Sequence, residues 1–209
     1  MTTLFWDVDT QADFILSSGK LYVPGSEEIV PALRQLTEYA HAHDIRILAS
    51  ADDHLPGHPE LSATPDWRET FPEHCMHGSA GQRKIEATAL HNPLVIEPVA
   101  ADPAALAQRV RAHPGDLLFH KHRFDVFSNP NLLPVVDALA PDRIVLYGVA
   151  LDVCDKFAVE GLLRERPRIP LTVVTDAVRA IDPAAGAALL EQWRRRGVRL
   201  ATAAELLAA

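Results

Sequence analysis

Short apolar runs alternate with longer segments of mixed polarity along most of the chain. The runs have the length of strands and lie at residues 4–8, 45–50, 94–96, 116–120, 143–148 and 171–175. Most of the segments between them repeat their apolar residues with the period of a helix. This alternation predicts a single α/β domain over residues 1–209, a doubly wound parallel sheet with helices on both faces.

The helical segments have recognisable ends. Ser26 is expected to cap a helix over 26–43, in which Pro31 marks an early distortion. The three arginines at 194–196 suit a helix end, where cations interact favourably with the helix dipole. Further helices are expected at 102–113, 129–140, 152–166 and 183–197.

The segment 51–81 has no clear period and is rich in Pro, Gly, Asp and His. A loop of this length within a compact domain is usually functional. We therefore expect a metal-binding or lid loop at about 51–81.

Composition narrows the class of protein. The chain has 209 residues, of which 48% are hydrophobic and 23% charged, and a net charge of -8. These values are ordinary for a globular domain and argue against a nucleic-acid partner. No apolar stretch reaches the length of a membrane span, no signal peptide precedes the first strand, and two cysteines cannot build a disulfide framework. We expect a reduced, cytoplasmic protein with no membrane or nucleic-acid partner.

Three carboxylates fall close together in the segment FWDVDTQADF near the start of the chain. One grouping, Asp7-x-Asp9, is similar to the nucleophile motif of haloacid dehalogenase-like phosphatases. The other, Asp9-x-Gln11-x-Asp13, leaves Asp7 as a structural residue of the strand. The phosphatase motif needs threonine or valine where Gln11 stands and makes no use of Cys154. The second grouping is therefore favoured.

Reactive side chains follow several of the predicted strands. They are Asp9 after the first strand, Asp52, Asp53 and His54 after the second, and Lys121 and Cys154 after later ones. Ligands bind beyond the carboxyl ends of the strands in a doubly wound sheet. We expect these side chains to converge at one edge of the sheet.

A thiol beside a cation and a base is the arrangement of an activated nucleophile. Cys154 begins a predicted helix, whose dipole should lower the pKa of the thiol, and Lys121 should stabilise the thiolate. Asp9 would accept the thiol proton and later donate it to a leaving amine. Each residue alone has a plainer interpretation, a small buried hydrophobe for the cysteine and a solvated ion pair for the other two. Their coincidence at three strand ends favours catalysis.

The chain resembles the isochorismatase-like cysteine hydrolases, of which nicotinamidase is the best-known member. The resemblance rests on the opening Asp9-x-Gln11-x-Asp13-Phe14 and on the segments GKLYVPGSEEIVP, KHRFDVFSNPNL and VLYGVALDVCDKFAV. These segments occur in the family's order and cover nearly the whole chain. One difference lies in the last segment, where Asp155 replaces the usual valine.

The resemblance implies a fold and a set of catalytic residues. The fold would be a six-stranded parallel sheet, and the catalytic triad would be Asp9, Lys121 and Cys154. The peptide bond between Val149 and Ala150 would be cis. The backbone N–H groups of Ala150 and Cys154 would then point at the oxyanion of the reaction.

The predicted loop contains residues suited to a metal site. Asp52 and His54 should point to one side of an extended segment, and His74 follows later, which suits a divalent ion with oxygen and nitrogen ligands. Nicotinamidases have a similar Asp-x-His and later His. The resemblance therefore implies that Asp52, His54 and His74 bind a divalent Zn, Mn or Fe ion with open water positions. His58 matches a further ligand of some relatives, and its role stays open; His77 is not expected to be a ligand.

Three aromatic residues could form a slot for a flat ring: Phe14, Phe71 and Phe127. Phe127 suits the core almost as well, and Cys75 is expected to be structural. The loop differs from the usual pattern at Asp53, which replaces an aromatic residue, and in the segment HCMHGSAGQR.

The leading hypothesis is a metal-containing cysteine amidohydrolase that converts nicotinamide and water to nicotinate and ammonia through a thioester on Cys154. An alternative in the same class acts on another small amide, a carbamoyl or ureido compound. A phosphatase and a non-catalytic binding scaffold are less favoured. The partners expected are a small-molecule amide substrate and further copies of the chain in a homo-oligomer.

Overall fold

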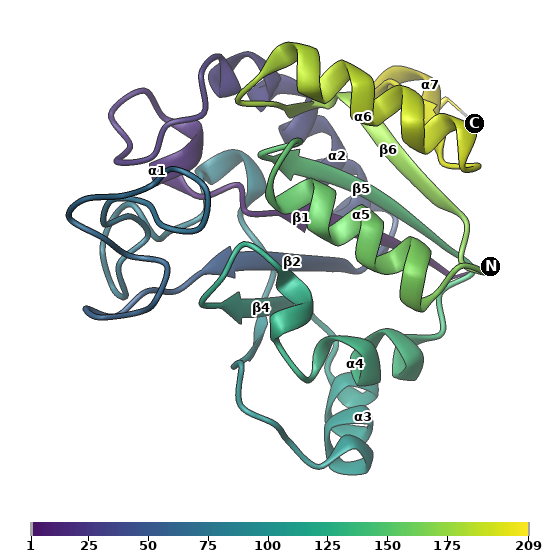
Figure 1. Ribbon diagram of the computed structural model, residues 1–209. Helices are drawn as coiled ribbons and strands as arrows, with labels where there is room; N and C mark the ends of the chain where they lie inside the picture. The colour runs from purple at the N-terminus through teal and green to yellow at the C-terminus, as the bar shows by residue number, and fades with distance from the viewer. Residues whose placement is uncertain (1, 209) are drawn as a thin grey trace.

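A seven-stranded parallel sheet runs through the computed structural model, which describes residues 2–208 (Figure 1). The strand order across the sheet is β3-β4-β2-β1-β5-β6-β7, and every neighbouring pair is parallel. The strands are β1 Thr3–Val8, β2 Ile47–Asp52, β3 Leu94–Ile96, β4 Leu117–Lys121, β5 Arg143–Val149, β6 Leu171–Arg179 and β7 Arg199–Ala201.

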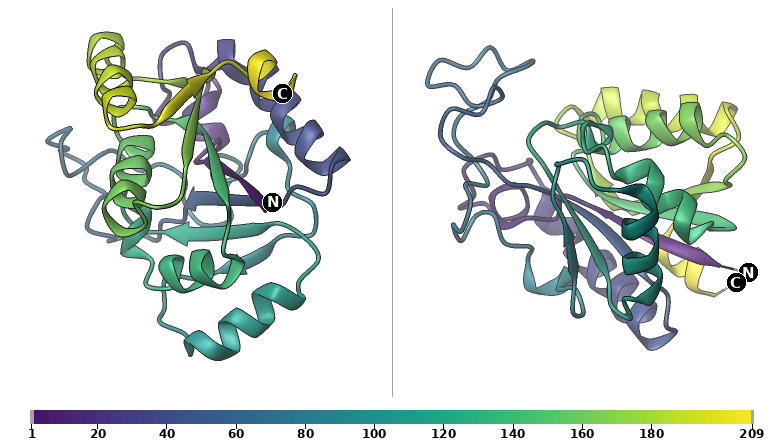
Figure 2. Two further views of the ribbon diagram at one scale, coloured as in Figure 1. Left: turned by 90° about the vertical axis from the view of Figure 1, so that its right-hand side faces the viewer. Right: turned by 90° about the horizontal axis from the view of Figure 1, so that it is seen from below.

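Helices cover both faces of the sheet (Figure 2). Buried residues of α3, α4, α5 and α6 belong to the hydrophobic cluster on one face, and those of α2 and α7 belong to the cluster on the other. The helices are α1 Ala12–Ile15, α2 Val30–Ala42, α3 Pro103–Ala112, α4 Leu132–Leu139, α5 Cys154–Glu165, α6 Pro183–Arg195 and α7 Ala203–Leu207, with short 3-10 helices η1 Ser26–Ile29, η2 Glu86–Thr88 and η3 Val126–Ser128.

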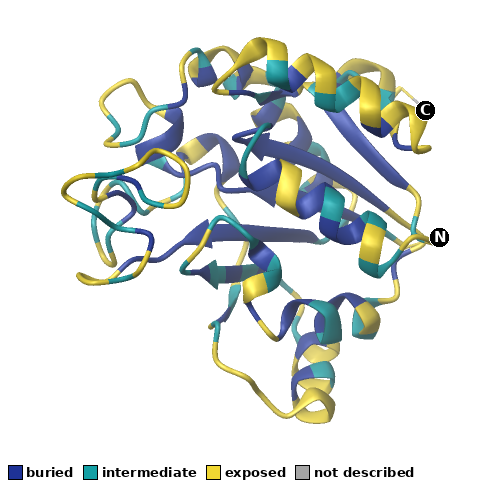
Figure 3. Cartoon of the chain, in the orientation of Figure 1, coloured by how far each residue is buried: buried dark blue, intermediate teal, exposed yellow. Residues whose placement is uncertain are grey.

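The central strands are buried on both faces, so their sequences read as continuous apolar runs rather than alternating ones. Figure 3 shows this as dark strands beneath helices with exposed outer faces. Trp6 on β1 and Trp193 on α6 are fully buried in the same cluster. Burying a large apolar side chain contributes roughly 1.5–3 kcal/mol to stability. The strand ends that carry the polar site residues are therefore held by a rigid core.

The predicted fold class is confirmed, but the predicted number of strands is wrong. The seventh strand, β7, has three residues, Arg199–Ala201, and forms the edge of the sheet beside β6. It begins with an exposed arginine directly after the turn that ends α6. The equally short β3 was predicted because Leu-Val-Ile reads as an apolar run, whereas the Arg-Leu-Ala of β7 does not.

The first predicted helix begins later than its sequence indicates. Residues Ser26–Ile29 form the 3-10 helix η1, and the α-helix starts at Val30 with Pro31 in its first turn. Proline suits this position because its missing N–H would have no partner there. The hydroxyl of Ser26 does not cap the helix; it donates to the carbonyl oxygens of Phe14 and Ile15. Ser26 thus fixes the segment after β1.

The segment between β2 and η2 contains no helix or longer strand and lies beyond the carboxyl ends of the strands (Figure 1). Isolated bridges pair His54 with Met76 and Leu61 with Phe71, so the loop folds back on itself. Within residues 2–208, no helix is long and apolar enough to cross a membrane.

Candidate active site

Asp9, Lys121 and Cys154 meet at the carboxyl edge of the sheet. Asp9 follows β1, Lys121 ends β4, and Cys154 begins α5 after β5. The Nζ atom of Lys121 lies 2.9 Å from Oδ2 of Asp9 and 3.8 Å from Sγ of Cys154. The other oxygen of Asp9 accepts a hydrogen bond of 2.7 Å from the Ser50 hydroxyl. The structure thus brings together the three residues of the predicted triad.

Lys121 is fully buried between two carboxylates. Besides Asp9, its ammonium group donates a short hydrogen bond to Oδ1 of Asp52. Burial lowers the pKa of Lys121, but Asp52 and Asp9 outweigh it and hold the pKa well above its usual range. The group is therefore a permanent cation beside the thiol.

The sequence-based expectation of a low pKa for Cys154 is wrong. Burial raises the pKa of the thiol well above its usual range. Lys121 acts in the opposite direction, but the carboxylates of Asp9 and Asp52 add to the effect of burial. Because two anions and desolvation outweigh one cation, the thiol keeps its proton in the resting site. A base must remove this proton before the sulfur can attack.

The turn before Cys154 presents two backbone donors. The peptide bond between Val149 and Ala150 is cis. The carbonyl oxygen of Ala150 accepts hydrogen bonds from the N–H groups of Val153 and Asp155, which closes the turn. The N–H groups of Ala150 and Cys154 themselves donate to no other group within residues 2–208. They are therefore available to a ligand in front of the thiol.

A second group of reactive side chains lies beside the triad: Asp52, His54, Glu60 and His74. All four are buried, and their nearest ligand atoms lie within 4.8 Å of one another. The Nε2 atom of His74 is 3.5 Å from Oδ2 of Asp52 and 3.7 Å from Oε1 of Glu60, and Nε2 of His54 is 3.9 Å and 3.8 Å from the same oxygens. The four ligand atoms thus surround one common point.

These four residues, the metal-type group, fit a divalent cation. Neither ring nitrogen of His54 has a hydrogen-bond partner within residues 2–208, nor has Oε2 of Glu60. Buried polar atoms without partners are rare, and an ion bound at the common point would satisfy them. Two imidazoles and two carboxylates are the ligands preferred by zinc and manganese.

The surrounding residues fix the orientation of these ligands. Nδ1 of His74 lies 2.7 Å from the Pro72 carbonyl oxygen, so it carries the proton and leaves Nε2 free to bind a metal. Burial lowers the pKa of His74, but Asp52 and Glu60 more than offset this and raise it to about 10. The Gln11 amide holds Asp52 by accepting from its backbone N–H and donating to its carbonyl oxygen.

The structure does not include His58, whose role the sequence left open, in this group. Its ring lies 5.7 Å from that of His54, and its Nδ1 accepts from the Leu55 N–H. Glu60, which the sequence analysis did not identify, is the fourth residue of the group. The residue type alone gives a weak signal: a glutamate that is fully buried almost always has a partner, and a metal ion is one such partner. A sequence cannot show, however, that this loop position is buried.

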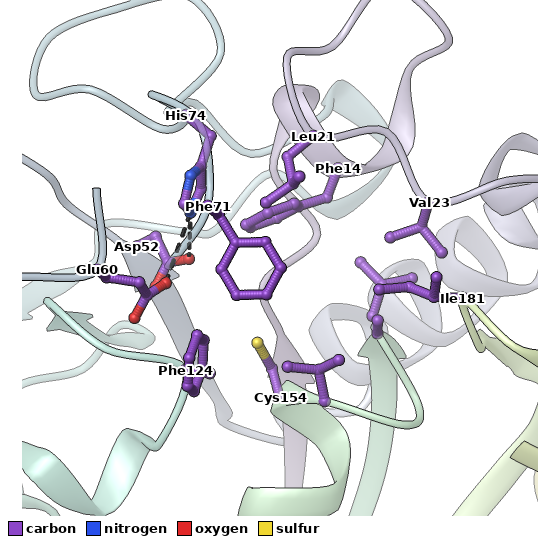
Figure 4. Close-up of a pocket in the computed structure, with 13 residues that line it drawn as sticks. Phe14, Leu21, Val23, Asp52, Glu60, Phe71, His74, Phe124, Cys154 and Ile181 are labelled. Atoms are coloured by element: carbon purple, nitrogen blue, oxygen red, sulfur yellow. Dashed lines mark ion pairs between the residues drawn. The ribbon is translucent and has the colours of Figure 1, made fainter. Parts of the chain in front are cut away.

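A small cavity is lined by Cys154 on one side and by Asp52, Glu60 and His74 on the other (Figure 4). Phe14 and Phe71 line it, as predicted, together with the sulfur of Cys154. Phe127 does not line it; its ring packs against Gly161 of α5 and under the guanidinium of Arg164. The third aromatic wall is Phe124, three positions earlier in the same segment.

Two carboxylates of the opening motif have structural roles. Asp7 is buried and pairs with Lys84 at 3.0 Å and with the Thr10 hydroxyl, so it does not face the cavity. Asp13 accepts hydrogen bonds from the backbone N–H groups of Cys75 and Lys20. These contacts tie the loop to the start of the chain.

The parallel sheet with reactive side chains gathered at its carboxyl edge is the arrangement of a hydrolase with an α/β fold. The isochorismatase domain family matches residues 4–205, and the chain belongs to this family. It is 25% identical over 203 residues to the nicotinamidase/pyrazinamidase of Mycobacterium tuberculosis, an alignment that covers 92% of this chain and 95% of that protein.

Solved structures show the same fold. Nicotinamidase/pyrazinamidase of Bacillus subtilis aligns with a TM-score of 0.74 at 15% identity, covering 96% of this chain and 100% of that one. Pyrazinamidase of Pyrococcus horikoshii in complex with zinc gives 0.73 at 19% identity, covering 97% and 99%. N-carbamoylsarcosine amidase of Thermoplasma acidophilum gives 0.70 at 24% identity, covering 97% of each chain.

Proposed function

We propose that the chain is a metal-containing cysteine amidohydrolase that converts a small neutral aromatic amide, with nicotinamide as the leading candidate, to its acid and ammonia. One observation carries the proposal. The sulfur of Cys154 lies 3.8 Å from a buried lysine that is itself 2.9 Å from Asp9, at the wall of a cavity that also borders three of the metal-type residues.

The residues of the triad would act in sequence. Asp9 takes the proton of the Cys154 thiol as the sulfur attacks the amide carbon, and Lys121 stabilises the sulfur's negative charge. The N–H groups of Ala150 and Cys154 donate to the oxyanion. Asp9 then returns the proton to the departing nitrogen, ammonia leaves, and a thioester remains. Asp9 activates a water molecule that cleaves the thioester and restores the thiol.

Asp52, His54, Glu60 and His74 would hold the divalent ion. When bound, the ion supplies Lewis acidity that polarises and orients a polar group of the substrate. Three of these residues, Asp52, Glu60 and His74, border the cavity, so they would hold the ion next to a bound substrate. Support for a metal in this position comes from the unpaired nitrogens of His54 and from the zinc complex of the Pyrococcus horikoshii pyrazinamidase.

The walls of the cavity favour a neutral substrate. Apart from Cys154 and the three metal-type residues, its lining is apolar, including Leu21, Val23, Phe124 and Ile181 (Figure 4). No lysine or arginine is among the described residues that line it. N-carbamoylsarcosine carries a carboxylate, and no lysine or arginine side chain in this apolar lining would replace the hydration that it loses. An uncharged aromatic ring instead gains the three phenylalanine walls.

The phosphatase alternative loses its nucleophile. Its D-x-D motif would use Asp7, but that carboxylate is fully buried and engaged with Lys84 and Thr10. Burial raises the pKa of Asp7, and Lys84 opposes this effect. We therefore do not propose phosphoryl transfer.

An assay of ammonia release tests the proposal. The wild type is expected to hydrolyse nicotinamide and pyrazinamide, to leave N-carbamoylsarcosine largely intact, and to lose all activity in Cys154→Ala. Cys75→Ala is the matched control, because it removes the other buried thiol, which does not border the cavity. Activity that survives Cys154→Ala would refute the mechanism, and no ammonia from any amide would favour a binding scaffold.

A further inference from the structure

A second group of metal-type side chains lies on the reverse side of the same strand ends. Glu97 follows β3, His120 is the penultimate residue of β4, and Asp53 follows β2; these three strands are neighbours in the sheet. Successive side chains of a strand point to opposite sides. Asp52 and Lys121 point to the side of the sheet edge where the triad lies. The residues beside them in the chain, Asp53 and His120, point to the other side and meet Glu97 there.

Too many acceptors converge on one imidazole nitrogen. Nδ1 of His120 lies 3.1 Å and 3.2 Å from the two oxygens of Glu97 and 3.5 Å from Oδ2 of Asp53. A single N–H makes one strong hydrogen bond and cannot satisfy two carboxylates. Ligands about 2.0–2.1 Å from a tetrahedral ion lie about 3.3 Å apart. The separations of His120 from the two carboxylates bracket this value, and the oxygens of Asp53 and Glu97 lie within 4.8 Å of each other.

The site is held in place by neighbouring groups. The other oxygen of Asp53 lies 2.7 Å from Nδ1 of His77 and accepts from the Gln82 amide at 2.6 Å. The backbone carbonyl of His120 accepts from the Asn129 amide. Contacts of this kind orient metal ligands. The side chains of Asp53 and His120 are largely buried, and that of Glu97 is 56% exposed, so an ion can reach the group from solvent.

We propose that Asp53, Glu97 and His120 form a second divalent-cation site, of the zinc or manganese class, with water completing the coordination. One imidazole and two carboxylates are a ligand set that either ion accepts. In the chain, Asp53 lies between Asp52 and His54, two residues of the metal-type group beside the triad. An ion here would therefore fix the end of β2 from the side opposite the triad. This inference does not depend on the proposed amidase activity.

Metal stoichiometry tests the proposal directly. The metal-free wild type is titrated with zinc chloride alone, and separately with manganese chloride alone, by isothermal calorimetry, and the bound metal is counted by elemental analysis. Glu97→Gln and His120→Ala are expected to bind one ion fewer than the wild type, or to bind it at least about tenfold more weakly. His113→Ala is the matched control, since its ring bonds the Asn92 carbonyl away from the group, and it should bind as many ions as the wild type.

The two groups can be told apart by their own variants. His54→Ala should remove the ion of the first group and leave the second, and Glu97→Gln should do the reverse. Glu97 is exposed, so its replacement by glutamine should leave the fold intact, as circular dichroism would check. A wild type that binds one ion, lost in His54→Ala and unchanged in affinity in Glu97→Gln, would overturn the second site while leaving the first intact.

Discussion

The two cysteines of this chain are both buried free thiols, yet their surroundings differ completely. Cys154 has Lys121 at 3.8 Å and borders the cavity. Cys75 has no place in the cavity lining; its N–H donates to Asp13, and its sulfur lies 3.9 Å from the Gly81 carbonyl oxygen. Burial raises the pKa of both thiols. What separates them is therefore not their acidity at rest but the presence of a cation, a base and space for a substrate.

Alkylation should reveal this difference most strongly. Iodoacetamide is expected to modify Cys154 at least about tenfold faster than Cys75 and to abolish hydrolysis, because only the thiolate reacts and only Cys154 has a base and a cation beside it. Peptide mass spectrometry of partly modified protein gives the two rates. Equal rates, with activity retained after modification, would break the distinction between the thiols.

Removing the cation should make the two thiols more alike. Lys121→Met should raise the pKa seen in the pH profile of Cys154 alkylation, since Lys121 is the group that lowers it, and should reduce hydrolysis on the order of 100-fold or more. Lys84→Met is the matched control, because Lys84 is paired with the buried Asp7 but belongs to a different part of the core. If both variants, or neither, change the profile, Lys121 is not the partner of the thiolate.

The surroundings of Cys154 extend to the metal-type group through Asp52. His54→Ala should lower the affinity of this group for metal at least about 10- to 100-fold, the loss typical of a mere outer-shell partner, while leaving the sheet folded, since His54 lies in the loop after β2. Glu60→Gln should act in the same direction. His58→Ala should have little effect, because its ring lies outside the group. Elemental analysis after dialysis compares the three; a large loss in His58→Ala alone would contradict the assignment.

The smallest expected effect concerns stability. Asp155 follows Cys154, is fully buried, and has no hydrogen-bond partner for either oxygen within residues 2–208. Burial raises its pKa well above the usual range, with Asp9 adding to the effect. Asp155→Val should therefore increase the free energy of unfolding by about 1–3 kcal/mol at neutral pH.

The gain from Asp155→Val should depend on pH. The native protein binds the Asp155 proton more tightly than the unfolded chain, so the wild type loses stability as pH rises above about 4, the usual pKa of an unfolded aspartate. The variant should gain least near pH 4 and most near pH 8 in urea unfolding. Asp155→Asn keeps a polar side chain that cannot ionise. It should therefore abolish the pH dependence of stability without removing the buried polar group. A gain that does not vary with pH would show that the carboxyl group is not protonated in the native state.

The sequence was sufficient to predict that the residues of the proposed triad lie together, because their positions depend on topology. Parallel strands end at one edge of a sheet, so Asp9, Lys121 and Cys154 were expected together once the strands were identified. Glu60 and Phe124 lie in irregular loops, where no period shows which side chains turn inward. The resting pKa of Cys154 was also beyond reach, because it depends on the balance of burial against charges from three separate strand ends.

The position of Lys121 between Asp9 and Asp52 has a thermodynamic consequence. One ammonium group forms an ion pair with a carboxylate of the triad and a hydrogen bond with a carboxylate of the metal-type group. A cation that binds Asp52 weakens the interaction of this carboxylate with Lys121, so the ammonium group interacts more strongly with the sulfur of Cys154. By reciprocity, any change in charge at Cys154 must alter the affinity for the cation by the same factor. The thiol of Cys154 and the metal-type group are therefore coupled through a single side chain.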